Sequence, residues 1–410
     1  MGTTMTFFIL GNHPTISIAE IASVIGTDHD YSLATPEVLL VPDLYANLGD
    51  LQERLGSVIK TGSIIGELKE WNHEDLAQLI FAYSYEAVGK EKISFGISVY
   101  DTEGTQSKNE LTKQLKRLGL ETKKLLKETG RPVRYASSKE LALSSVIVKT
   151  NSLLESGGEF VIILYKDKVL VGQTATVQDF EAWSDRDYGR PARDPKSGML
   201  PPKLARTMIN LSGVDPKGKT LLDPFCGSGT VLMEGILLGC KETIGGDISE
   251  KAIADTKKNL KWFARTHLEE PLELSLFKSP AKDLADQFEQ QASLIIAETY
   301  LGPPRLGRES ETKLRETIEE LTKENIESFK TLYDLLKSDG RAVIAFPAYK
   351  LRENFLYLPI LEELKKIGFK QINPLPDSIP TALNQTTPSG ALLYKRANQH
   401  VAREIFVLEK

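Results

Sequence analysis

The stretch KTLLDPFCGSGTVLMEGILLGCKETIGGDIS, residues 219–249, decides the fold of the C-terminal half of the chain. An apolar run ends at Asp223, a glycine-rich turn follows, and an apolar segment with helical spacing begins near Thr230. A second strand-like run ends at Asp247. Gly227 and Gly229 let the turn bend and approach a ligand without a Cβ clash. The stretch therefore predicts the strand, loop, helix and strand of an α/β domain with a parallel sheet.

The chemistry of the turn indicates which ligand it binds. A dinucleotide fingerprint needs a third glycine where Leu232 stands, and the Gly-Lys-Ser or Gly-Lys-Thr ending of a phosphate loop is missing. Asp223 would repel a pyrophosphate and suits a cation, such as the α-ammonium of S-adenosylmethionine. Asp247 can accept hydrogen bonds from both ribose hydroxyls. A structural glycine turn of another α/β fold is the alternative. The predicted cofactor-binding residues are Asp223, Phe225, Gly227, Gly229, Thr230, Asp247 and Ile248.

The third strand should supply a polar group for the adenine amine. Residues 272–288, LELSLFKSPAKDLADQF, place Pro280 where an acid is expected. Asp283 is a candidate substitute, and a helix cap or a surface acid is its alternative interpretation. We therefore add Asp283 to the predicted cofactor-binding residues.

Composition and charge restrict the class of protein. The chain has 410 residues, with 41% hydrophobic and 26% charged residues, which is ordinary for a globular protein. No apolar run approaches the ~20 residues of a membrane span. Two cysteines and five scattered histidines predict neither a disulfide framework nor a metal site. We expect a cytoplasmic protein that binds neither membrane nor metal.

The charge is unevenly distributed along the chain. The net charge is −5, but residues 107–150 contain eleven Lys or Arg against four Glu, a local net of +7 that leaves −12 elsewhere. Such asymmetry can mark a nucleic-acid face, although a solvated amphipathic helix is an alternative. The predicted RNA-binding residues of this segment are Lys113, Lys116, Arg117, Lys123, Lys124, Arg131 and Arg134.

The order of strand-like and helix-like segments predicts four regions. Residues 1–65 predict a small α+β module, and residues 66–177 a second one with a long basic helix and a hairpin around residues 166–168. Residues 178–200 are charged and rich in Pro and Gly, which is typical of a linker. Residues 201–410 repeat strand and helix, which predicts a parallel sheet with helices on both faces.

Nearly the whole chain resembles the THUMP-domain RNA methyltransferases, in particular the tRNA guanine-N2-methyltransferases of archaea and eukaryotes that act on guanosine 10. The resemblance is carried by FFILGNHPTISIAEI, VGQTATVQDFEAWSDRDYGRPARD, MLPPKLARTMINLSG and DPFCGSGT, and by the closing LLYKRANQHVAREIFVLEK. It implies a ferredoxin-like module at 1–65, a THUMP domain at 66–177 that grips tRNA, and a Rossmann-like class I methyltransferase domain at 201–410. In that domain the resemblance implies a seven-stranded mixed sheet, with ALLYKR and EIFVLEK as its antiparallel sixth and seventh strands. In the linker, Arg190 and Arg193 are predicted to touch RNA, with bracing of the domains or pairing to nearby Asp as alternatives.

The catalytic loop of that family, Asp-Pro-Pro-Tyr after the fourth strand, appears here in altered form. The stretch LIIAETYLGPP, residues 294–304, has Glu298, Thr299 and Tyr300, and is one residue shorter. The exocyclic amine of guanine is a poor nucleophile, so a carboxylate must accept its N–H groups and an aromatic ring must fix the base plane. We predict Glu298 and Tyr300 as catalytic residues; an ion-pair partner or a helix cap is the structural alternative for Glu298.

The leading hypothesis is thus an S-adenosylmethionine-dependent tRNA (guanine-N2)-methyltransferase acting at position 10. Alternatives are the same chemistry at another guanosine such as position 6, a catalytically silent tRNA-binding relic, and a DNA amino-methyltransferase. No obligatory protein partner is expected, although eukaryotic relatives work with a small activating subunit.

Overall fold

The structure is a computed structural model. It describes residues 4–86, 92–101, 107–193, 199–269, 272–288, 291–305, 307–379, 386–397 and 399–410. The chain divides into two compact units. Unit 1 comprises residues 1–14, 28–54 and 58–180, and unit 2 comprises residues 15–27, 55–57 and 181–410.

Unit 1 is built on one mixed eight-stranded sheet with the order β2-β3-β1-β4-β8-β7-β5-β6. Most neighbours are antiparallel, but β5 runs parallel to both β6 and β7. The strands are β1 (Met5–Leu10), β2 (Ser32–Thr35), β3 (Val38–Pro42), β4 (Val58–Leu68), β5 (Ile93–Asp101), β6 (Val133–Ala136), β7 (Gly157–Tyr165) and β8 (Lys168–Val177). The predicted hairpin around residues 166–168 is confirmed, since Tyr165 pairs with Lys168 and Lys166 occupies the left-handed turn position.

Two long helices of unit 1, α3 (His73–Glu86) and α4 (Lys108–Lys127), pack against each other and share one apolar core with β5 and β7. The basic helix α4 begins at Ser107, whose hydroxyl accepts a hydrogen bond from the Glu110 amide. Its leucines at 111, 115 and 118 recur at helical spacing and are buried, so its lysines must face outward. The shorter helices are α2 (Leu48–Arg54), α5 (Ser145–Thr150) and α6 (Leu153–Ser156).

The predicted boundary between the two N-terminal modules is wrong as a structural boundary. Strand β4 runs without interruption through residues 65 and 66, and it pairs with β1 on one side and β8 on the other. Both sequence regions therefore contribute strands to one sheet. Farther along the chain, helices α5 and α6 are separated at Ser152, which adopts a left-handed conformation.

Unit 2 contains a second sheet, whose main path is β11-β10-β9-β12-β13-β17-β15. Strands β9 to β13 are parallel, and β17 is antiparallel to β13. The strands are β9 (Thr220–Asp223), β10 (Glu242–Asp247), β11 (Ser275–Lys278), β12 (Ala292–Glu298), β13 (Leu336–Leu351), β14 (Asn354–Tyr357), β15 (Lys370–Ile372), β16 (Leu392–Tyr394) and β17 (Val401–Glu409). The prediction of an α/β domain with a mixed, largely parallel sheet is confirmed for this part of the chain.

The count of seven strands needs a correction. The described sheet has nine strands, because β14 adds to β13 and β16 adds to β17 beside the seven-strand path. The segment ALLYKR forms β16, which pairs antiparallel with β17 as predicted, but the path itself ends on β15. The short β15 carried too weak an alternation to be recognised as a strand.

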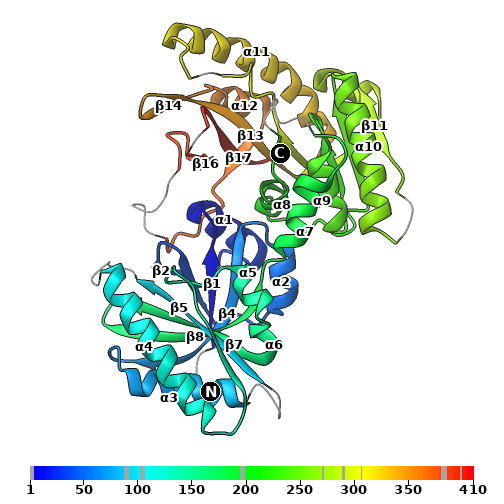
Figure 1. Ribbon diagram of the computed structural model, residues 1–410. Coiled ribbons are helices and arrows are strands. Elements are labelled where there is room, and N and C mark those ends of the chain that lie inside the picture. Colours follow the sequence, from blue (N-terminus) through cyan, green and yellow to red (C-terminus); the bar gives the residue numbers. More distant parts are fainter. Residues whose placement is uncertain are drawn as a thin grey trace. The chain divides into compact units, whose positions relative to one another are not determined.

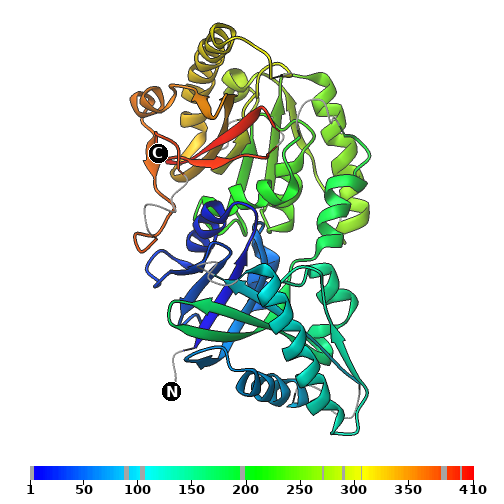
Figure 2. The same cartoon turned by 60° about the vertical axis from the view of Figure 1, so that its left-hand side comes forward.

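Helices cover the second sheet, with α11 (Glu311–Leu335) and α12 (Leu361–Ile367) together on one side (Figure 1). Helices α8 (Pro202–Leu211) and α9 (Thr230–Leu237) pack against each other, and α10 (Glu250–His267) contacts β10 and β11. Figure 2 shows these layers from a second direction. Strand β12 is buried along nearly its whole length, which explains its continuous apolar sequence. The remaining helical elements of unit 2 are α1 (Pro14–Ile25, from residue 15 onward) and the 3₁₀ turn η2 (Ala281–Asp286).

The predicted linker is ordered where the structure describes it. Residues Phe180–Ser184 form α7, and Asp185–Gly189 continue as one π-helical turn, η1. Trp183 is buried, with the guanidinium carbons of Arg186 and Arg206 lying 4.3 and 4.8 Å from its ring. Both arginines pair with the buried Glu234 of α9 at 2.7 Å. The part of the predicted linker that the structure describes is therefore helical and packed by its aromatic and arginine side chains.

Candidate active site

Two carboxylates at the ends of β9 and β10 shape the glycine-rich loop. Asp223, which is 2% exposed, accepts a hydrogen bond from the Phe225 amide at 3.1 Å. One oxygen of Asp247 accepts from the Gly227 amide at 3.0 Å, and the other accepts from the Ser249 amide at 2.8 Å. The carboxyl ends of adjacent parallel strands thus meet beside the loop, which is where α/β sheets bind ligands.

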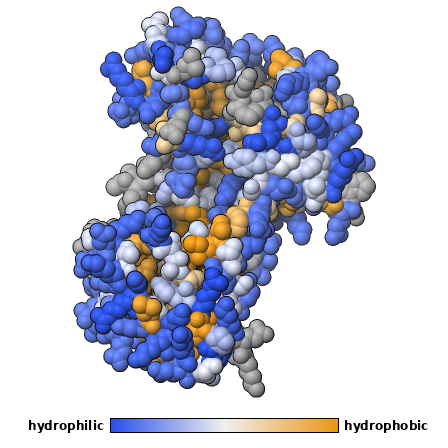
Figure 3. Space-filling view, in the orientation of Figure 1, coloured by the Kyte–Doolittle hydropathy of each residue, from blue (hydrophilic) through white to orange (hydrophobic). Residues whose placement is uncertain are grey.

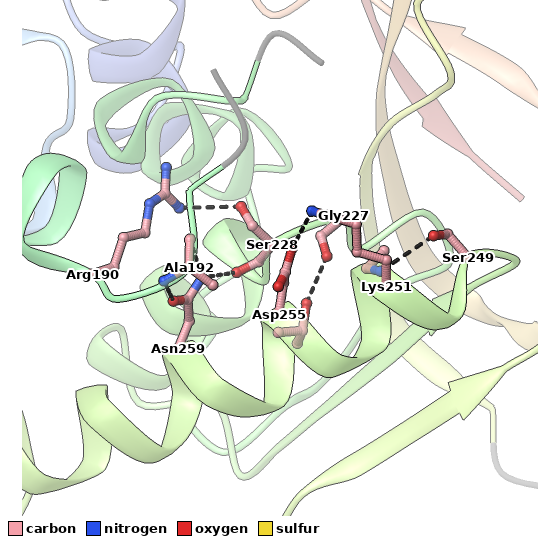
Figure 4. A network of polar contacts seen from close by, with 10 residues as sticks. Arg190, Ala192, Gly227, Ser228, Ser249, Lys251, Asp255 and Asn259 are labelled. Carbon is pink, nitrogen blue, oxygen red and sulfur yellow. Dashed lines mark hydrogen bonds and ion pairs between the residues drawn. The ribbon is translucent and has the colours of Figure 1, made fainter. Parts of the chain in front are cut away.

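The outer side of the loop is held by α10. The Asn259 amide binds both backbone groups of Ala192, at 2.8 and 2.9 Å, and donates to the Ser228 carbonyl at 2.9 Å (Figure 4). Gly229 has a φ of 83°, and a Cβ at this position would lie 2.9 Å from the Thr256 side chain. Only glycine fits this close approach between the loop and α10 without strain.

Arg190 supports the same loop, so its predicted role as an RNA contact is wrong. The residue is 2% exposed and donates hydrogen bonds to Thr230 at 2.6 Å and Ser228 at 3.4 Å. Figure 4 shows its guanidinium directed at Ser228. The helical turns α7 and η1 direct this side chain into the protein, where it also pairs with Asp187 at 3.8 Å, as the alternative interpretation anticipated. Arg193 is exposed and lies against the Tyr188 ring at 4.8 Å, so it stays a predicted RNA contact.

A cavity of about 680 Å³ opens in unit 2 over the loop. Its walls come from the ends of β9, β10 and β12, the start of α10, the turn before η2, and the middle of α11. Among the predicted cofactor residues, Asp223, Phe225, Gly227, Thr230, Asp247 and Ile248 line it. Gly229 does not line it and acts through the loop packing described above.

Asp283 lies outside this cavity, against the prediction. It sits in η2 with an exposed side chain, while the adjacent Pro280, Ala281 and Lys282 line the wall. The 3₁₀ turn that follows β11 carries Asp283 away from the sheet edge, which a strand-based register could not reveal. Asn325 of α11 lines the same wall and was not predicted, because nothing local in the sequence connects α11 to the loop.

The electrostatics of the cavity favour a cationic ligand. Burial raises the pKa of Asp223 well above its usual range, and the nearby carboxylates of Asp247 and Glu298 raise it further. In the described part of the chain no cation pairs with Asp223. A buried carboxylate without a counter-ion is costly, and a positively charged ligand would relieve that cost.

The other end of the cavity is formed by the loop after β12. Both predicted catalytic residues, Glu298 and Tyr300, line the cavity, and Tyr300 is 59% exposed. Between them, Thr299 is buried, and its amide donates to the Ala345 carbonyl at 3.0 Å, which extends the pairing of β12 with β13 by one residue. The hydrogen bond of Thr299 therefore fixes the start of the loop, and the loop places a carboxylate and an aromatic ring in the wall of the same cavity.

Glu298 also has the ion-pair partner that the alternative interpretation anticipated. Its carboxylate accepts a hydrogen bond from Nε of Arg403 on β17, whose side chain is 3% exposed. Burial raises the pKa of Glu298, and the charges of Arg403 and Arg396 oppose that rise. Sequence reasoning missed Arg403. The available signal was a charged pair, Arg403 and Glu404, inside the apolar run of the last strand.

The continuation of the loop is fixed by β13. The Tyr349 hydroxyl donates to the Leu301 carbonyl at 2.9 Å, and the guanidinium of Arg305 lies 5.2 Å from the Tyr349 ring. Gly302 has a φ of 82°, and a Cβ there would come within 2.3 Å of the Tyr349 hydroxyl. Tyr349 and Phe346 are buried in the core, and neither lines the cavity.

Removing the Tyr349 hydroxyl should loosen this loop. We expect Tyr349→Phe to lower the free energy of unfolding by about 1 kcal/mol, the usual net value of a hydrogen bond. The turnover rate should fall more than the cofactor affinity, because the bond holds the loop that carries Tyr300 rather than the glycine-rich loop. Tyr333→Phe, in the same core cluster and without a described hydrogen bond from its hydroxyl, is the matched control. Equal effects of the two substitutions would contradict the assigned role of Tyr349.

The predicted RNA-binding residues of unit 1 lie on and after α4. Figure 3 shows a mostly hydrophilic surface over this helix. Lys113, Lys116, Arg117 and Lys124 are exposed along one stripe, although Arg117 also pairs with Glu121 at 2.8 Å. Of the seven predicted residues, five are exposed and two are half-buried. The exposed residues are Lys113, Lys116, Arg117, Lys124 and Arg134, and the half-buried ones are Lys123 and Arg131.

The order of the second sheet, the glycine-rich loop and the strand-end carboxylates together define a Rossmann-like class I methyltransferase. A protein family described as "RMKL-like, methyltransferase domain" matches residues 190–371. The structure of TrmN from Thermus thermophilus is similar in fold, with a TM-score of 0.55, 18% identity and 99% coverage of both chains.

Two archaeal relatives indicate which family of methyltransferases the chain resembles in sequence. A tRNA (guanine(10)-N2)-dimethyltransferase of Methanothermobacter thermautotrophicus is 32% identical over 160 residues, 38% of this chain and 44% of the relative. A protein of Methanothermococcus thermolithotrophicus, described as "Probable tRNA (guanine(10)-N2)-dimethyltransferase", is 36% identical over 144 residues, 35% of this chain and 78% of the relative. The chain belongs to the tRNA (guanine-N2)-methyltransferase family, and it spans less than half of the first relative's length.

Within the described residues, no helix is long and apolar enough to cross a bilayer. The same residues contain no group of three or more His, Cys, Asp or Glu side chains arranged to hold a metal ion.

Proposed function

We propose that the protein transfers a methyl group from S-adenosylmethionine to the exocyclic N2 of a guanosine in tRNA, with guanosine 10 as the preferred target. The observation that carries this proposal is the shared cavity. It joins the glycine-rich loop and the carboxylates Asp223 and Asp247 to the carboxylate and ring of Glu298 and Tyr300. The relatives named above for the same activity at guanosine 10 support the choice of substrate.

The donor set fits S-adenosylmethionine. Asp223 supplies a buried negative charge for its ammonium group, and Asp247 keeps lone pairs for the ribose hydroxyls although each oxygen already accepts one backbone N–H. Phe225, Ile248 and Ala281 offer apolar surface for the adenine. When bound, the cofactor supplies an activated methyl group on a positively charged sulfur, which becomes a neutral thioether on transfer.

The residues of the chain orient the base. The Glu298 carboxylate accepts N–H groups of the guanine amine, which directs the nitrogen lone pair toward the reacting carbon. It then takes the proton that the nitrogen loses as its new N–C bond forms. The exposed Tyr300 ring stacks on the extruded base and fixes its plane. Thr299 and Tyr349 hold these two side chains at a constant spacing. Such positioning is the main contribution a site can make to this reaction.

In this proposal unit 1 is a ferredoxin-like and THUMP assembly that binds tRNA through α4, and the protein acts in the cytoplasm without an obligatory partner. Clustered Lys and Arg bind the phosphate backbone, and such binding weakens as salt displaces it. The stripe on α4 offers this cluster on a single rigid helix.

A triple substitution of Lys113, Lys116 and Lys124 by alanine should weaken tRNA binding. We expect the slope of log affinity against log salt to become shallower by about 0.7–0.9 for each phosphate that the variant no longer neutralises. Cofactor affinity should not change. Alanine at Lys113, Lys116 and Lys124 is compared with alanine at Lys313, Lys323 and Lys330, which are exposed on α11. Equal reductions of affinity in the two triple variants would place the tRNA-binding surface elsewhere.

The test of the proposed function is methyl transfer by the purified chain. Unmodified tRNA transcripts are incubated with labelled S-adenosylmethionine, and digestion identifies the modified nucleoside. We expect N2-methylguanosine or its dimethyl form, and loss of the product when guanosine 10 is replaced. Product that persists after this replacement would indicate another guanosine, such as position 6. Binding of cofactor and tRNA without product would favour the silent relic.

A further inference from the structure

Arg403, which binds the carboxylate of Glu298, lies on β17, two strands away from β12 in the sheet. Strand β13 lies between β12 and β17, with Ala345 opposite Glu298 and Pro347 opposite Arg403. Two strand spacings amount to about 9.5 Å, so only two long side chains can meet across β13. The small side chain of Ala345 leaves the space between them open. An aspartate at position 298 would be one methylene shorter, which gives the unusual glutamate of this loop a physical reason.

Arg403 is itself firmly held. Its guanidinium lies 5.9 Å from the ring of Tyr394 on β16, and its Nη1 donates to Gln399 at 3.4 Å. Tyr394 in turn accepts a hydrogen bond from Arg396 at 2.9 Å. Fixing the guanidinium in this way also fixes the carboxylate that it binds.

The bond to Arg403 uses one oxygen of Glu298. Nε donates to Oε1, and among the described residues no hydrogen bond to Oε2 is present. Glu298 lines the cavity and Arg403 does not, so the pair reaches the cavity only through the carboxylate.

We infer that Arg403 is a positioning residue for the proposed methyl transfer: it binds Oε1 of Glu298, holds the carboxylate as an anion, and leaves Oε2 to accept the guanine amine. This inference rests on the proposed function. It explains how a glutamate in a shortened loop can perform the task for which the family uses an aspartate.

The charges around Glu298 make the role of Arg403 necessary. Burial favours the neutral acid, whereas the electrostatic interaction with Asp223 on β9 raises the pKa of Asp223 itself. The opposing positive charges are Arg403 on β17 and Arg396 after β16, of which only Arg403 contacts Glu298. In a protonated Glu298, one oxygen would carry a hydrogen and act as a donor, so the two oxygens could no longer accept from Arg403 and from the guanine amine at the same time. Without Arg403, Glu298 would therefore be neutral over a wider range of pH.

The test is the pH dependence of methyl transfer in a single turnover. For Arg403→Gln, which keeps a polar side chain but removes the charge, we expect the acid limb of the profile to move up by about one pH unit or more. At alkaline pH most of the rate should return. Arg403→Lys should move the limb less than Arg403→Gln, because the charge is kept. Arg341→Gln, which breaks the pair with Glu409 at 3.1 Å in the same sheet, is the matched control and should not move it. A decrease of equal size at every pH, or an unmoved limb, would overturn the inference.

A second measurement does not depend on activity. Carbon-13 NMR of glutamate carboxyls, with the Glu298 signal identified by its absence in Glu298→Gln, reports the Glu298 pKa directly. We expect this pKa to be higher in the Arg403 variants than in the wild type. If wild type methylates no tRNA but this shift is seen, the proposed function fails and the Arg403–Glu298 coupling stands. If methylation is present without the shift, only the inference fails. Should Arg403→Gln not fold, the lysine variant decides both measurements.

Discussion

Glu298→Gln is expected to lower the single-turnover rate of methyl transfer by about 10²–10⁴-fold, the range for losing a positioned proton acceptor. Glutamine retains the length of the side chain and one oxygen that can accept from Arg403. It loses the negative charge, and its amide group presents donors where the guanine amine also presents donors. The cofactor affinity should change little, because the loop around Asp223 is untouched.

The control for this prediction is Glu298→Asp. Aspartate retains the charge but is too short to reach Arg403 across β13, so the rate should fall by less than in Glu298→Gln. Thermal unfolding of both variants verifies that the sheet is intact. A Glu298→Gln protein with wild-type rate would reduce Glu298 to a structural ion-pair partner.

Asp223→Asn is expected to affect binding and stability in opposite directions. The affinity for S-adenosylmethionine should fall by about 10–100-fold, because a hydrogen bond to a charged group contributes roughly 1.5–3 kcal/mol. The free energy of unfolding of the cofactor-free protein should rise, since the substitution removes a buried carboxylate that has no cation partner among the described residues. Asparagine can still accept the hydrogen bond from the Phe225 amide.

The effect of Asp223→Asn on the free energy of unfolding should depend on pH. The folded-state pKa of Asp223 is raised, so the folded protein binds this proton more tightly than the unfolded chain does. The stabilisation from that proton is fully present below the unfolded pKa of about 3.9 and is lost as pH rises through the folded pKa. The advantage of Asp223→Asn over wild type should therefore grow as pH rises across this window.

Isothermal titration with the cofactor and thermal unfolding across pH measure the two effects. Asp339→Asn, at an exposed position near the start of β13, is the matched control and should change neither. A cofactor-free Asp223→Asn protein less stable than wild type at neutral pH would contradict the picture of an unpaired buried charge.

Local sequence was sufficient for the glycine-rich loop and the two carboxylates beside it. The run that ends at Asp223, the turn to Gly229 and the run that ends at Asp247 are contiguous, and their hydrogen bonds join residues that are close in the chain or in adjacent strands. Strand periodicity and glycine geometry operate over a few residues, so a pattern can reveal them. The same holds for α4, whose apolar stripe and N-cap are both local features.

Predictions from local sequence were wrong where the position of a residue depends on contacts with distant parts of the chain. Arg190 was predicted at an RNA surface and instead supports the loop 38 to 40 residues further on. Asp283 was placed by register on the third strand, but a 3₁₀ turn removes it from the cavity. No structural boundary falls at residue 65, because β4 pairs with β1 of the first predicted module and with β8 of the second.

The sequence by itself determined that this chain has a methyltransferase loop, two strand-end carboxylates and a Glu-Thr-Tyr segment after an apolar strand, because each is written in consecutive residues. Only the tertiary structure decided that Glu298 meets Arg403, 105 residues away and across an intervening strand. The order of strands sets that distance, and strand order follows from how whole elements bury their apolar faces rather than from any local pattern.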